Sequence, residues 1–390
     1  MNIPPDVLPP ELMGKRLRIA RETARLRQQD AASQIGLSRT TLVAIEKGDR
    51  AVKGSELRAL VDLYGISMNQ LLRKDSVHVD LVPRFRRLPE VGDPGVDDAA
   101  QVLNELVSAE VELEDVLGVV HSSHLPPERH LSVGDVRQQA ESDALELRNW
   151  LGLGVRPVAD IKSLLELELG VRVYEYPLHA KVSGLFAYDD EIGACILINA
   201  LHPPERQAQS LAHELGHIVS SRRKPEVLAE EQSHNSREER YATVFGRVFL
   251  MPTRAVIQKF REITAGATKL TRRHVIILAH FFGVSREAAV RRLEELGLAR
   301  EGSWDWFAEK GRITDAQVTA VLGMQQPKRP VGFGGGARVS LKLGTMAAEA
   351  MSRGILSEGQ ISQLLKIDRV VARSLHDEIE DGDDELHELH

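Results

Sequence analysis

The residues best suited to chemistry in this sequence are two histidines and a glutamate near its middle. His213 and His217 are four positions apart, and Glu214 directly follows the first histidine. Helical residues four apart lie on one face, so both imidazoles can bind one Zn²⁺, or another divalent ion such as Mn²⁺. Glu214 lies on the adjacent flank, where its carboxylate can take a proton from a water activated by the metal. The pattern predicts a catalytic metal centre rather than a merely polar helix face.

A catalytic zinc site needs a third protein ligand, which must come from further along the chain. The candidates are Glu230, Glu231, His234, Glu238 and Glu239. Glu239 begins a predicted helix, residues 237–249, whose small and apolar residues recur at steps of three and four and would hold it facing inward. Glu238 lies one residue off that face, and His234 falls in a predicted loop. These arguments favour Glu239.

Hydrophobic periodicity predicts the elements that would position this site. Residues 171–176 alternate as a half-buried strand, and residues 184–188 and 194–198 are two further β-prone runs. A helix over residues 204–220 would carry the two histidines, and the helix over residues 237–249 would carry Glu239. We expect a mostly α, α+β fold with a small antiparallel sheet packed beside the histidine helix.

Pro- and Gly-rich stretches mark the joints of the chain. Residues 75–95 and 327–336 are expected to be linkers. Between them, residues 97–120 predict an acidic helix, which suits a solvated spacer better than a cover over the metal cleft. Ser132 is expected to cap the next helix, which would run to Leu151.

Charge is unevenly distributed, although the whole chain carries a net charge of −7. Residues 1–75 hold 13 Lys and Arg against 9 Asp and Glu, a net charge of +4, so the remainder carries −11. Residues 1–75, here called the basic head, thus precede an acidic remainder, and this asymmetry hints at a local nucleic-acid-binding face. No apolar run approaches the roughly 18 residues that a membrane span needs. The single cysteine, Cys195, excludes an internal disulfide framework. A cytoplasmic protein without a membrane partner is therefore expected.

The basic head has the turn chemistry of a helix-turn-helix. One helix is expected over residues 28–35, Gly36 would make the tight turn, and Ser38 would cap a second helix over residues 39–46. The outward side chains of that second helix are short polar or basic groups able to meet base edges, namely Arg39, Thr40 and Thr41, next to Ser38 at its start. Phosphates could be held by Arg16, Lys47 and Arg50.

Residues 16–72 resemble the Cro/repressor-type, or XRE, helix-turn-helix family, most clearly from Gln28 to Gly48. The resemblance implies a five-helix domain that binds a duplex DNA operator, most often as two copies on a pseudo-palindrome, so a homodimer is expected. Gln29 falls where family members commonly place a Gln that touches DNA. Gln28 stands where Thr is usual, a modest change at the helix start. The alternative to a DNA-binding domain is a helical bundle that contacts only other proteins.

Residues 155–298 resemble the ImmA/IrrE zinc metallopeptidases, which have a zincin-like domain. The resemblance rests on the strand residues 196–199, on Ala212 to His217, and on Glu239 to Pro252, a helix ending in Leu-Met-Pro. It implies that Glu239 takes the place of the third, gluzincin-like ligand. Thr243 and Gly246 depart from the family's usual Asn and Ala. The family implies site-specific endopeptidases that act on repressor-type proteins, some of them in stress or mobile-element responses.

These observations divide the chain into four expected parts. Residues 11–74 form the helix-turn-helix domain, residues 75–130 a linker and acidic helix, residues 131–300 the metallopeptidase domain, and residues 301–390 a helical region with an acidic tail. Residues 271–298 also look like a helix-turn-helix, but are expected to be packing helices.

Two functions are consistent with this organisation. The first is a DNA-binding transcriptional regulator with a zinc endopeptidase that cuts a repressor-type protein or its own residues 75–95. The second is a repressor whose zinc domain is a non-catalytic sensing or partner-docking module.

Overall fold

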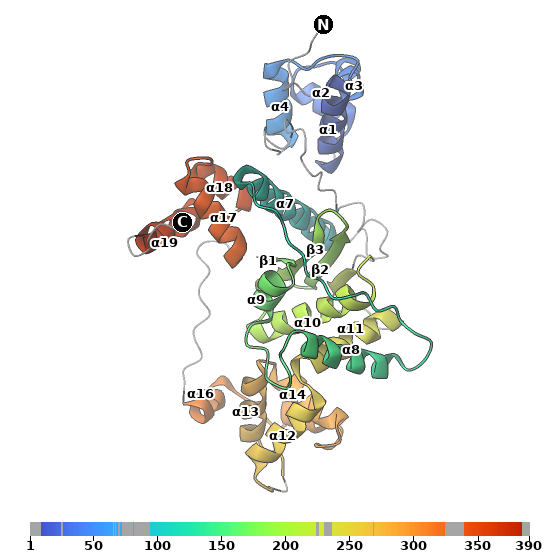
Figure 1. Ribbon diagram of the computed structural model, residues 1–390, viewed down its shortest axis with the longest axis vertical. Helices are drawn as coiled ribbons and strands as arrows, with labels where there is room; N and C mark the ends of the chain where they lie inside the picture. Colours follow the sequence, from blue (N-terminus) through green and yellow to red (C-terminus); the bar gives the residue numbers. More distant parts are fainter. Residues whose placement is uncertain are drawn as a thin grey trace.

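A computed structural model describes residues 9–24, 26–64, 66, 68, 71, 81, 94–223, 226–229, 236–267, 269–323 and 339–383. Figure 1 shows a small helical bundle, α1–α4, at one end of the molecule, a sheet with its helices in the middle, and α12–α16 at the other end. The helices α17–α19 lie beside α7. The fold is α-rich with one small sheet, as predicted. No helix in the described ranges is long and apolar enough to cross a membrane.

The N-terminal bundle consists of α1 (Pro10–Thr23), α2 (Gln28–Gln34), α3 (Arg39–Lys47) and α4 (Gly54–Tyr64). Gly36 adopts a φ of 71° in the turn between α2 and α3, and the Ser38 hydroxyl accepts a hydrogen bond from the Thr41 N–H at the start of α3. The predicted helix-turn-helix is therefore present, with both helices ending within one residue of expectation. The predicted fifth helix falls on residues that lie mostly outside the described part of the chain.

The sheet contains four described strands in the order β1-β3-β2-β4, namely β1 (Arg172–Tyr176), β2 (Val182–Asp189), β3 (Gly193–Asn199) and β4 (Glu226–Ala229). The prediction of a wholly antiparallel sheet is wrong, because β1 pairs parallel with β3. The short β1–β2 connection turns the chain back, and β3, antiparallel to β2, fills the gap between them. Buried Asn199 binds the backbone of that connection at Leu178 and Val182, which fastens the turn. β4, which no pattern predicted, pairs antiparallel with β2.

One face of the sheet packs against the helices that carry the histidines and Glu239. These are α10 (Pro204–Ser220) and α11 (Arg237–Leu250), with α8 (Val136–Trp150) against α11. Their shared core includes Ile196 and Phe186 from the sheet and Leu215 and Phe245 from the helices, all completely buried. Burial of one large apolar side chain stabilises the folded state by about 1.5–3 kcal/mol. This core therefore supplies much of the domain's stability. Asp135 caps α8, so the prediction that Ser132 caps this helix is wrong.

The opposite face of the sheet is covered by α7 (Pro94–Leu117) and α17 (Leu341–Ser352), with α18 (Glu358–Leu365) and α19 (Arg369–Asp383) alongside. Leu103 and Leu113 of α7 and Leu343 of α17 belong there to one buried core that also contains Leu197 of β3. The acidic helix is therefore a core element rather than a solvated spacer. Its apolar residues lie on one side and pack into the core on the sheet. It also lies across the sheet from α10, so it does not cover the histidines.

The remaining helices support the ends of this domain. They are α9 (Ile161–Ser163), the π-helical turn η1 (Leu164–Glu168), α12 (Thr253–Thr264), α13 (Arg272–Phe282), α14 (Arg286–Glu295), α15 (Ser303–Glu309) and α16 (Asp315–Leu322). Residues 271–298 do have a helix-turn-helix shape, with Gly283 at φ 63° and Ser285 capping α14. Their buried residues, such as Leu278 and Leu293, pack into the same core as α10 and α11.

A buried ionic cluster fastens α17 to the rest of the domain. Arg172 on β1 pairs with Glu110 at 2.7 Å and with Glu114 at 2.8 Å, both on α7. Lys342 on α17 pairs with the same two carboxylates at 2.9 and 2.7 Å. Such a cluster holds α17 in register, because removing one cation would leave a buried carboxylate uncompensated.

Glu166 lies at the same junction in an unfavourable setting for its charge. Its side chain is buried on η1, next to Ser340, which caps α17. Burial raises the pKa of Glu166 to about 7, although the charge of Lys162 opposes the shift. Glu110 and Glu175, which also face this carboxyl, raise the pKa further. The folded protein therefore binds a proton that the unfolded chain releases at lower pH.

We expect the variant Glu166→Gln to be more stable than the parent at pH 8 and equally stable near pH 4. The parent loses stability as pH rises from the unfolded pKa, near 4.5, to the folded value of about 7, whereas the amide does not titrate. The difference at pH 8 should be about 3 kcal/mol, from the size of the shift. Chemical unfolding at several pH values measures it, with exposed Glu168→Gln as control. A difference that does not depend on pH would contradict this assignment.

Candidate metal centre and nucleic-acid interface

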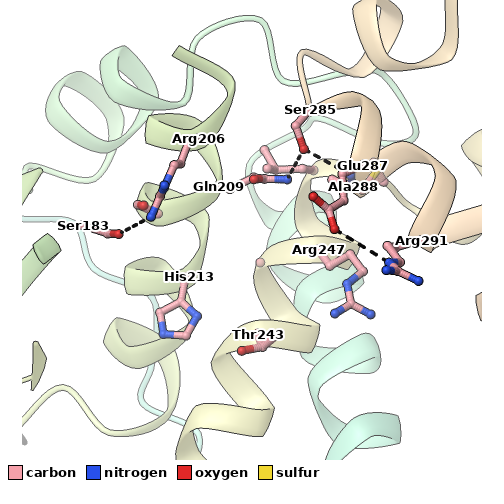
Figure 2. A pocket seen from close by; sticks show the side chains of 14 residues that line it. Ser183, Arg206, Gln209, His213, Thr243, Arg247, Ser285, Glu287, Ala288 and Arg291 are labelled. Carbon is pink, nitrogen blue, oxygen red and sulfur yellow. Dashed lines mark hydrogen bonds and ion pairs between the residues drawn. The ribbon is translucent and has the colours of Figure 1, made fainter. Parts of the chain in front are cut away.

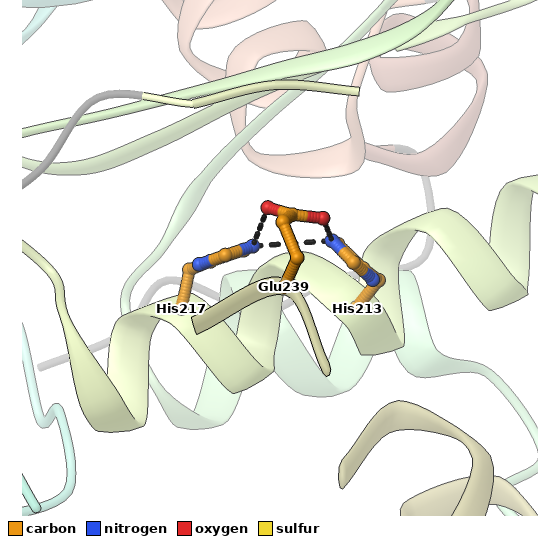
Figure 3. Close-up of side chains that lie close together, drawn as sticks. All are labelled: His213, His217 and Glu239. Carbon is orange, nitrogen blue, oxygen red and sulfur yellow. Dashed lines mark hydrogen bonds and ion pairs between the residues drawn. The ribbon is translucent and has the colours of Figure 1, made fainter. Parts of the chain in front are cut away.

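His213, His217 and Glu239 converge on one point between α10 and α11 (Figure 3). The two histidine Nε2 atoms lie 3.1 Å apart. The Glu239 carboxylate reaches both rings, with one oxygen 3.1 Å from His217 Nε2 and the other 3.4 Å from His213 Nε2. The rings are nearly enclosed, since His217 is 0 % and His213 9 % exposed. The structure thus brings together the three residues that the sequence analysis favoured.

Close packing of α10 on α11 sets Glu239 opposite the histidines. A Cβ on Gly216 would lie 2.8 Å from the Ala242 Cα, and a Cβ on Gly246 would lie 2.8 Å from the Ala212 carbonyl carbon. Both glycines are therefore required by the close approach of the two helix backbones. Ser236 starts α11 by accepting a hydrogen bond from the Glu239 N–H, which fixes the backbone of Glu239 in the first turn.

Contacts with the two histidines stabilise the ionised form of Glu239. Burial of Glu239 disfavours ionisation, but the hydrogen bonds from His213 and His217 outweigh it and hold the pKa of this carboxyl well below its usual range. On the far side of the His217 ring, Nδ1 lies 3.4 Å from the Ser221 hydroxyl. Such a contact orients an imidazole so that Nε2 points toward the other two ligands.

These three residues fit a zinc ion. Zn²⁺ bonds of about 2.0–2.1 Å in tetrahedral geometry place the donor atoms roughly 3.3–3.4 Å apart. The 3.1 Å between the two Nε2 atoms is close to that edge length. One Glu239 oxygen lies 3.1 Å from His217 Nε2 and the other 3.4 Å from His213 Nε2, and one ligand atom from each of the three residues lies within 4.8 Å of the others. Two imidazoles and one carboxylate also form one of the donor sets of catalytic zinc. Glu214 follows His213 on α10 and is completely buried, so its carboxyl is shielded from bulk water.

We expect the variant Gly216→Ala to weaken both folding and metal binding. The added methyl group would meet the Ala242 backbone and push α11 away, at a cost of about 1–3 kcal/mol. Glu239 would move with α11, so zinc affinity should fall as well. Thermal unfolding of the apo and zinc-loaded protein separates the two effects. As a control, Gly54→Ala, where a Cβ meets nothing within 4 Å and the backbone φ is not positive, should leave zinc affinity unchanged. Normal zinc affinity in Gly216→Ala would contradict this role for the helix crossing.

A second group of acidic and histidine side chains does not share these properties. Glu110, Glu114 and His121 also bring their ligand atoms close together. Arg172 and Lys342 already neutralise both carboxylates at hydrogen-bonding distance. A divalent cation would add charge to a balanced cluster, so this group serves structure.

A cleft of about 640 Å³ opens beside His213 (Figure 2). Its walls come from α10 and α14, and residues of α11 lie between them, with Thr243 and Arg247 in view. Gln209 and Ser285 approach across it at 3.5 Å. Thr243, the position that departs from the usual Asn, lines this cleft. The cleft therefore reaches the triad at His213.

The predicted DNA contacts lie on and around α3. Gln29, Ser38, Arg39, Thr40 and Lys47 are exposed, and Thr41 is partly buried. The hydroxyls of Thr40 and Thr41 both lie 2.8 Å from the Ser38 oxygen. Arg50 forms a bidentate ion pair with Glu56 at 2.9 and 3.0 Å. Arg16 donates to the Leu71 carbonyl, so a phosphate role for either arginine would compete with a contact inside the domain.

Buried Glu46 joins the helices that present this surface. It accepts two hydrogen bonds from Arg21 on α1, at 2.6 and 3.1 Å, and one from Gln28 on α2 at 2.8 Å. Gln28, the departure noted in the sequence, therefore takes part in the link between α2 and α3. Charge-assisted bonds of this kind fix the relative orientation of the helices.

Sequence reasoning missed residues that position the site rather than form it. Ser221 lies four residues after His217, so helical spacing alone could have found it. Ser236 lies three residues before Glu239, the usual distance for an N-cap contact. Arg206 and the α14 residues of the cleft meet only through the tertiary fold, and no spacing in the sequence signals them. Glu230, Glu231 and His234, the other ligand candidates, lie outside the described residues.

Profiles of known domain families match two parts of the chain. A helix-turn-helix domain matches residues 12–73. The IrrE N-terminal-like domain of peptidase family M78 matches residues 167–294. The chain thus joins a helix-turn-helix domain, which points to DNA binding, to a metallopeptidase-like domain of the ImmA/IrrE type. Both matches agree with the resemblances stated from the sequence.

Other comparisons add little. No curated protein sequence matches the chain. Solved structures similar to it include ComR from Streptococcus suis, at 9 % identity over 96 % of this chain and 95 % of that one, with a TM-score of 0.16. ComR from Streptococcus vestibularis is 11 % identical over 97 % of this chain and 100 % of that one, with a TM-score of 0.17. Scores this low support no argument about fold or function.

Proposed function

Since the chain joins a helix-turn-helix domain to a metallopeptidase-like domain, we propose that it is a DNA-binding transcriptional regulator with a zinc-dependent endopeptidase activity. His213, His217 and Glu239 are the metal ligands, and Glu214 is the general base. The observation that carries this proposal is the convergence of two imidazoles and a carboxylate, with one ligand atom from each within 4.8 Å of the others. This donor set is one that catalytic zinc sites use, and a cleft of about 640 Å³ opens beside His213.

Each residue of the site has a distinct task in peptide hydrolysis. A zinc ion at such a site acidifies water and polarises a peptide carbonyl. Glu214 accepts the proton of the attacking water and transfers it to the leaving amine. Ser221 orients His217, and Ser236 fixes the start of the helix that carries Glu239. Because Glu214 is completely buried, its carboxylate is held away from competing bulk water.

The substrate we propose is a repressor-type protein, either a separate partner or another copy of this chain. Covalent attachment to a DNA-reading domain would bring the peptidase to proteins that occupy the same operator, as in a stress or mobile-element response. Within this chain, residues 75–95 are the self-cleavage candidate, since their Pro-rich, polar composition suits an exposed linker. Nearly all of that segment lies outside the described residues.

Product analysis tests the peptidase half. The purified zinc-loaded chain is incubated alone and with helix-turn-helix repressors from the same genome, and the products are identified by mass spectrometry. We expect one or a few defined cuts in a linker, lost on chelation and restored by Zn²⁺ or Mn²⁺. If every substrate stays intact with each ion, the zinc domain is a non-catalytic sensing or docking module instead.

For the DNA half, we expect residues on α3 and Arg50 to affect binding differently. Arg39→Ala and Thr40→Ala should relax sequence preference, because exposed side chains at the start of α3 would meet base edges. Arg50→Ala should weaken binding to all sequences alike and reduce its salt dependence. Selection from a random duplex library, followed by salt titrations, measures both. The selected sites should be pseudo-palindromic with half-sites about one helical turn apart. Failure to select any sequence would contradict the operator-binding role.

A further inference from the structure

One residue of the segment expected to be a linker is buried. Leu81 lies within residues 75–95, and its exposed fraction is 0 %. It belongs to the core that also contains residues of α7 and α17. Because water is excluded from a completely buried leucine, the hydrophobic effect favours its place in this core over a solvated position. The linker is thus attached to the body of the protein at this residue.

A polar contact holds the backbone of the same residue. The Leu81 N–H donates a hydrogen bond to Oδ1 of Asn104 on α7, at 2.8 Å. Asn104 is only 4 % exposed and lies on the buried side of α7, together with Leu103 and Val107. A buried amide oxygen is costly to leave without a donor. Asn104 therefore binds the linker backbone, while the core binds its leucine side chain.

The sheet separates this contact from the metal triad, with α7 and α10 on its two sides (Figure 1). The core that contains Leu81 includes Leu185 and Leu197, whereas their strand neighbours Phe186 and Ile196 belong to the core shared with α10 and α11. Alternate residues of a strand point to opposite faces of a sheet. Three residues of extended chain span only about 10 Å, the usual spacing of packed layers. Bonds close to Leu81 therefore cannot reach the triad while this residue is docked.

We propose that Leu81 is an anchor that fastens the linker to α7 and withholds the bonds beside it from the peptidase site. Leu81 must leave the core before these bonds are cut. A second copy of the chain meets the same obstacle, because a docked Leu81 cannot enter another cleft. The anchor itself rests on burial and hydrogen bonding, whereas its effect on self-cleavage rests on the proposed peptidase function.

Limited digestion with trypsin tests the anchor without using the metal centre. Arg84 lies three residues after Leu81, and trypsin must bind the residues around a bond in order to cut it. The zinc-loaded Glu214→Gln chain is digested with and without the change Leu81→Ala, and the cut after Arg84 is timed by mass spectrometry. We expect this cut to be about tenfold faster or more in Leu81→Ala, given the usual effect of truncating a buried leucine. Proteolysis follows the population of the open form when opening and closing are fast.

Companion variants separate a specific anchor from a general loss of stability. Leu81→Met keeps most of the buried volume and should be digested at close to the parent rate. Asn104→Ala removes the acceptor on the other side of the contact and should accelerate the same cut. The matched control on α7 is Ser108→Ala, which removes a hydroxyl that donates to the Asn104 carbonyl. We expect this control to leave the rate unchanged.

Self-cleavage of chains that retain Glu214 then tests the effect on the peptidase. Leu81→Ala should cut itself within residues 75–95 about tenfold faster or more than the parent, for the same reason. Faster digestion by trypsin with no self-cleavage in either chain would support the anchor and contradict self-cleavage. Equal trypsin rates in the parent and Leu81→Ala would overturn the anchor. Faster digestion by trypsin with equal self-cleavage in both chains would overturn the withholding of the linker and leave the peptidase function standing.

Discussion

Replacing Glu214 by Gln should reduce peptide cleavage by about 10²–10⁴-fold, the usual contribution of a general base. The amide has nearly the same shape as the carboxylate but cannot accept the proton of the attacking water. Because Glu214 is not one of the three converging ligands, the variant should keep its zinc and its affinity for operator DNA. Cleavage rate, zinc content and DNA binding of the purified variant are the three measurements.

The matched control for this change is Glu205→Gln, in the first turn of the same helix. Glu205 is not among the residues that line the cleft, so its variant should cleave as the parent does. Cleavage that persists in Glu214→Gln would show that another group is the base or that a contaminant is the protease. Loss of zinc from that variant would instead place Glu214 among the ligands.

Removing Glu239 should release the metal. With the Ala variant, two imidazoles remain, and zinc affinity should fall by more than about 100-fold, beyond the 10–100-fold typical of residues that only orient ligands. The loss should be similar in His213→Ala, because each change leaves two of three protein ligands. Elemental analysis should find about one zinc per parent chain and substoichiometric zinc in both variants after dialysis against a weak chelator.

Glu238→Ala is the control, since it removes a carboxylate from the neighbouring position of α11. We expect it to retain zinc. The converse result, with full zinc in Glu239→Ala and none in Glu238→Ala or His234→Ala, would overturn the ligand assignment. Folding must be followed in parallel, because Glu239 and the histidines are largely buried and a metal-free site also loses stability.

Much of the site was predictable because its signals are local. The helix expected over residues 204–220 has those bounds in the structure, and the helix expected over residues 237–249 ends one residue later. Spacing of three and four residues along one helix decides which side chains share a face. The favoured choice of Glu239 over Glu238 used the same rule, and the structure places Glu239 against both histidines.

Local patterns could not determine how the elements pair. β1 pairs parallel with β3 because β3 lies between β1 and β2 in the sheet. The alternation of apolar and polar residues along one strand does not show which strand will be its neighbour. The acidic helix α7 was expected in solvent because its charge is obvious, but its apolar stripe packs on the sheet and its carboxylates meet Arg172 and Lys342. The charge of a helix does not by itself show whether the fold places oppositely charged side chains beside it.

The sequence by itself therefore determined the two domains, the metal-binding residues we propose and the turn of the DNA-binding head, since each depends on residues within a helix or a turn. Only the tertiary structure decided that Gly216 and Gly246 serve the crossing of α10 and α11. It also decided that Arg206 and Arg291, from helices far apart in the chain, line one cleft. The physical reason is that helical geometry acts over a few residues, whereas the shape and charge of a cleft arise from packing between distant segments.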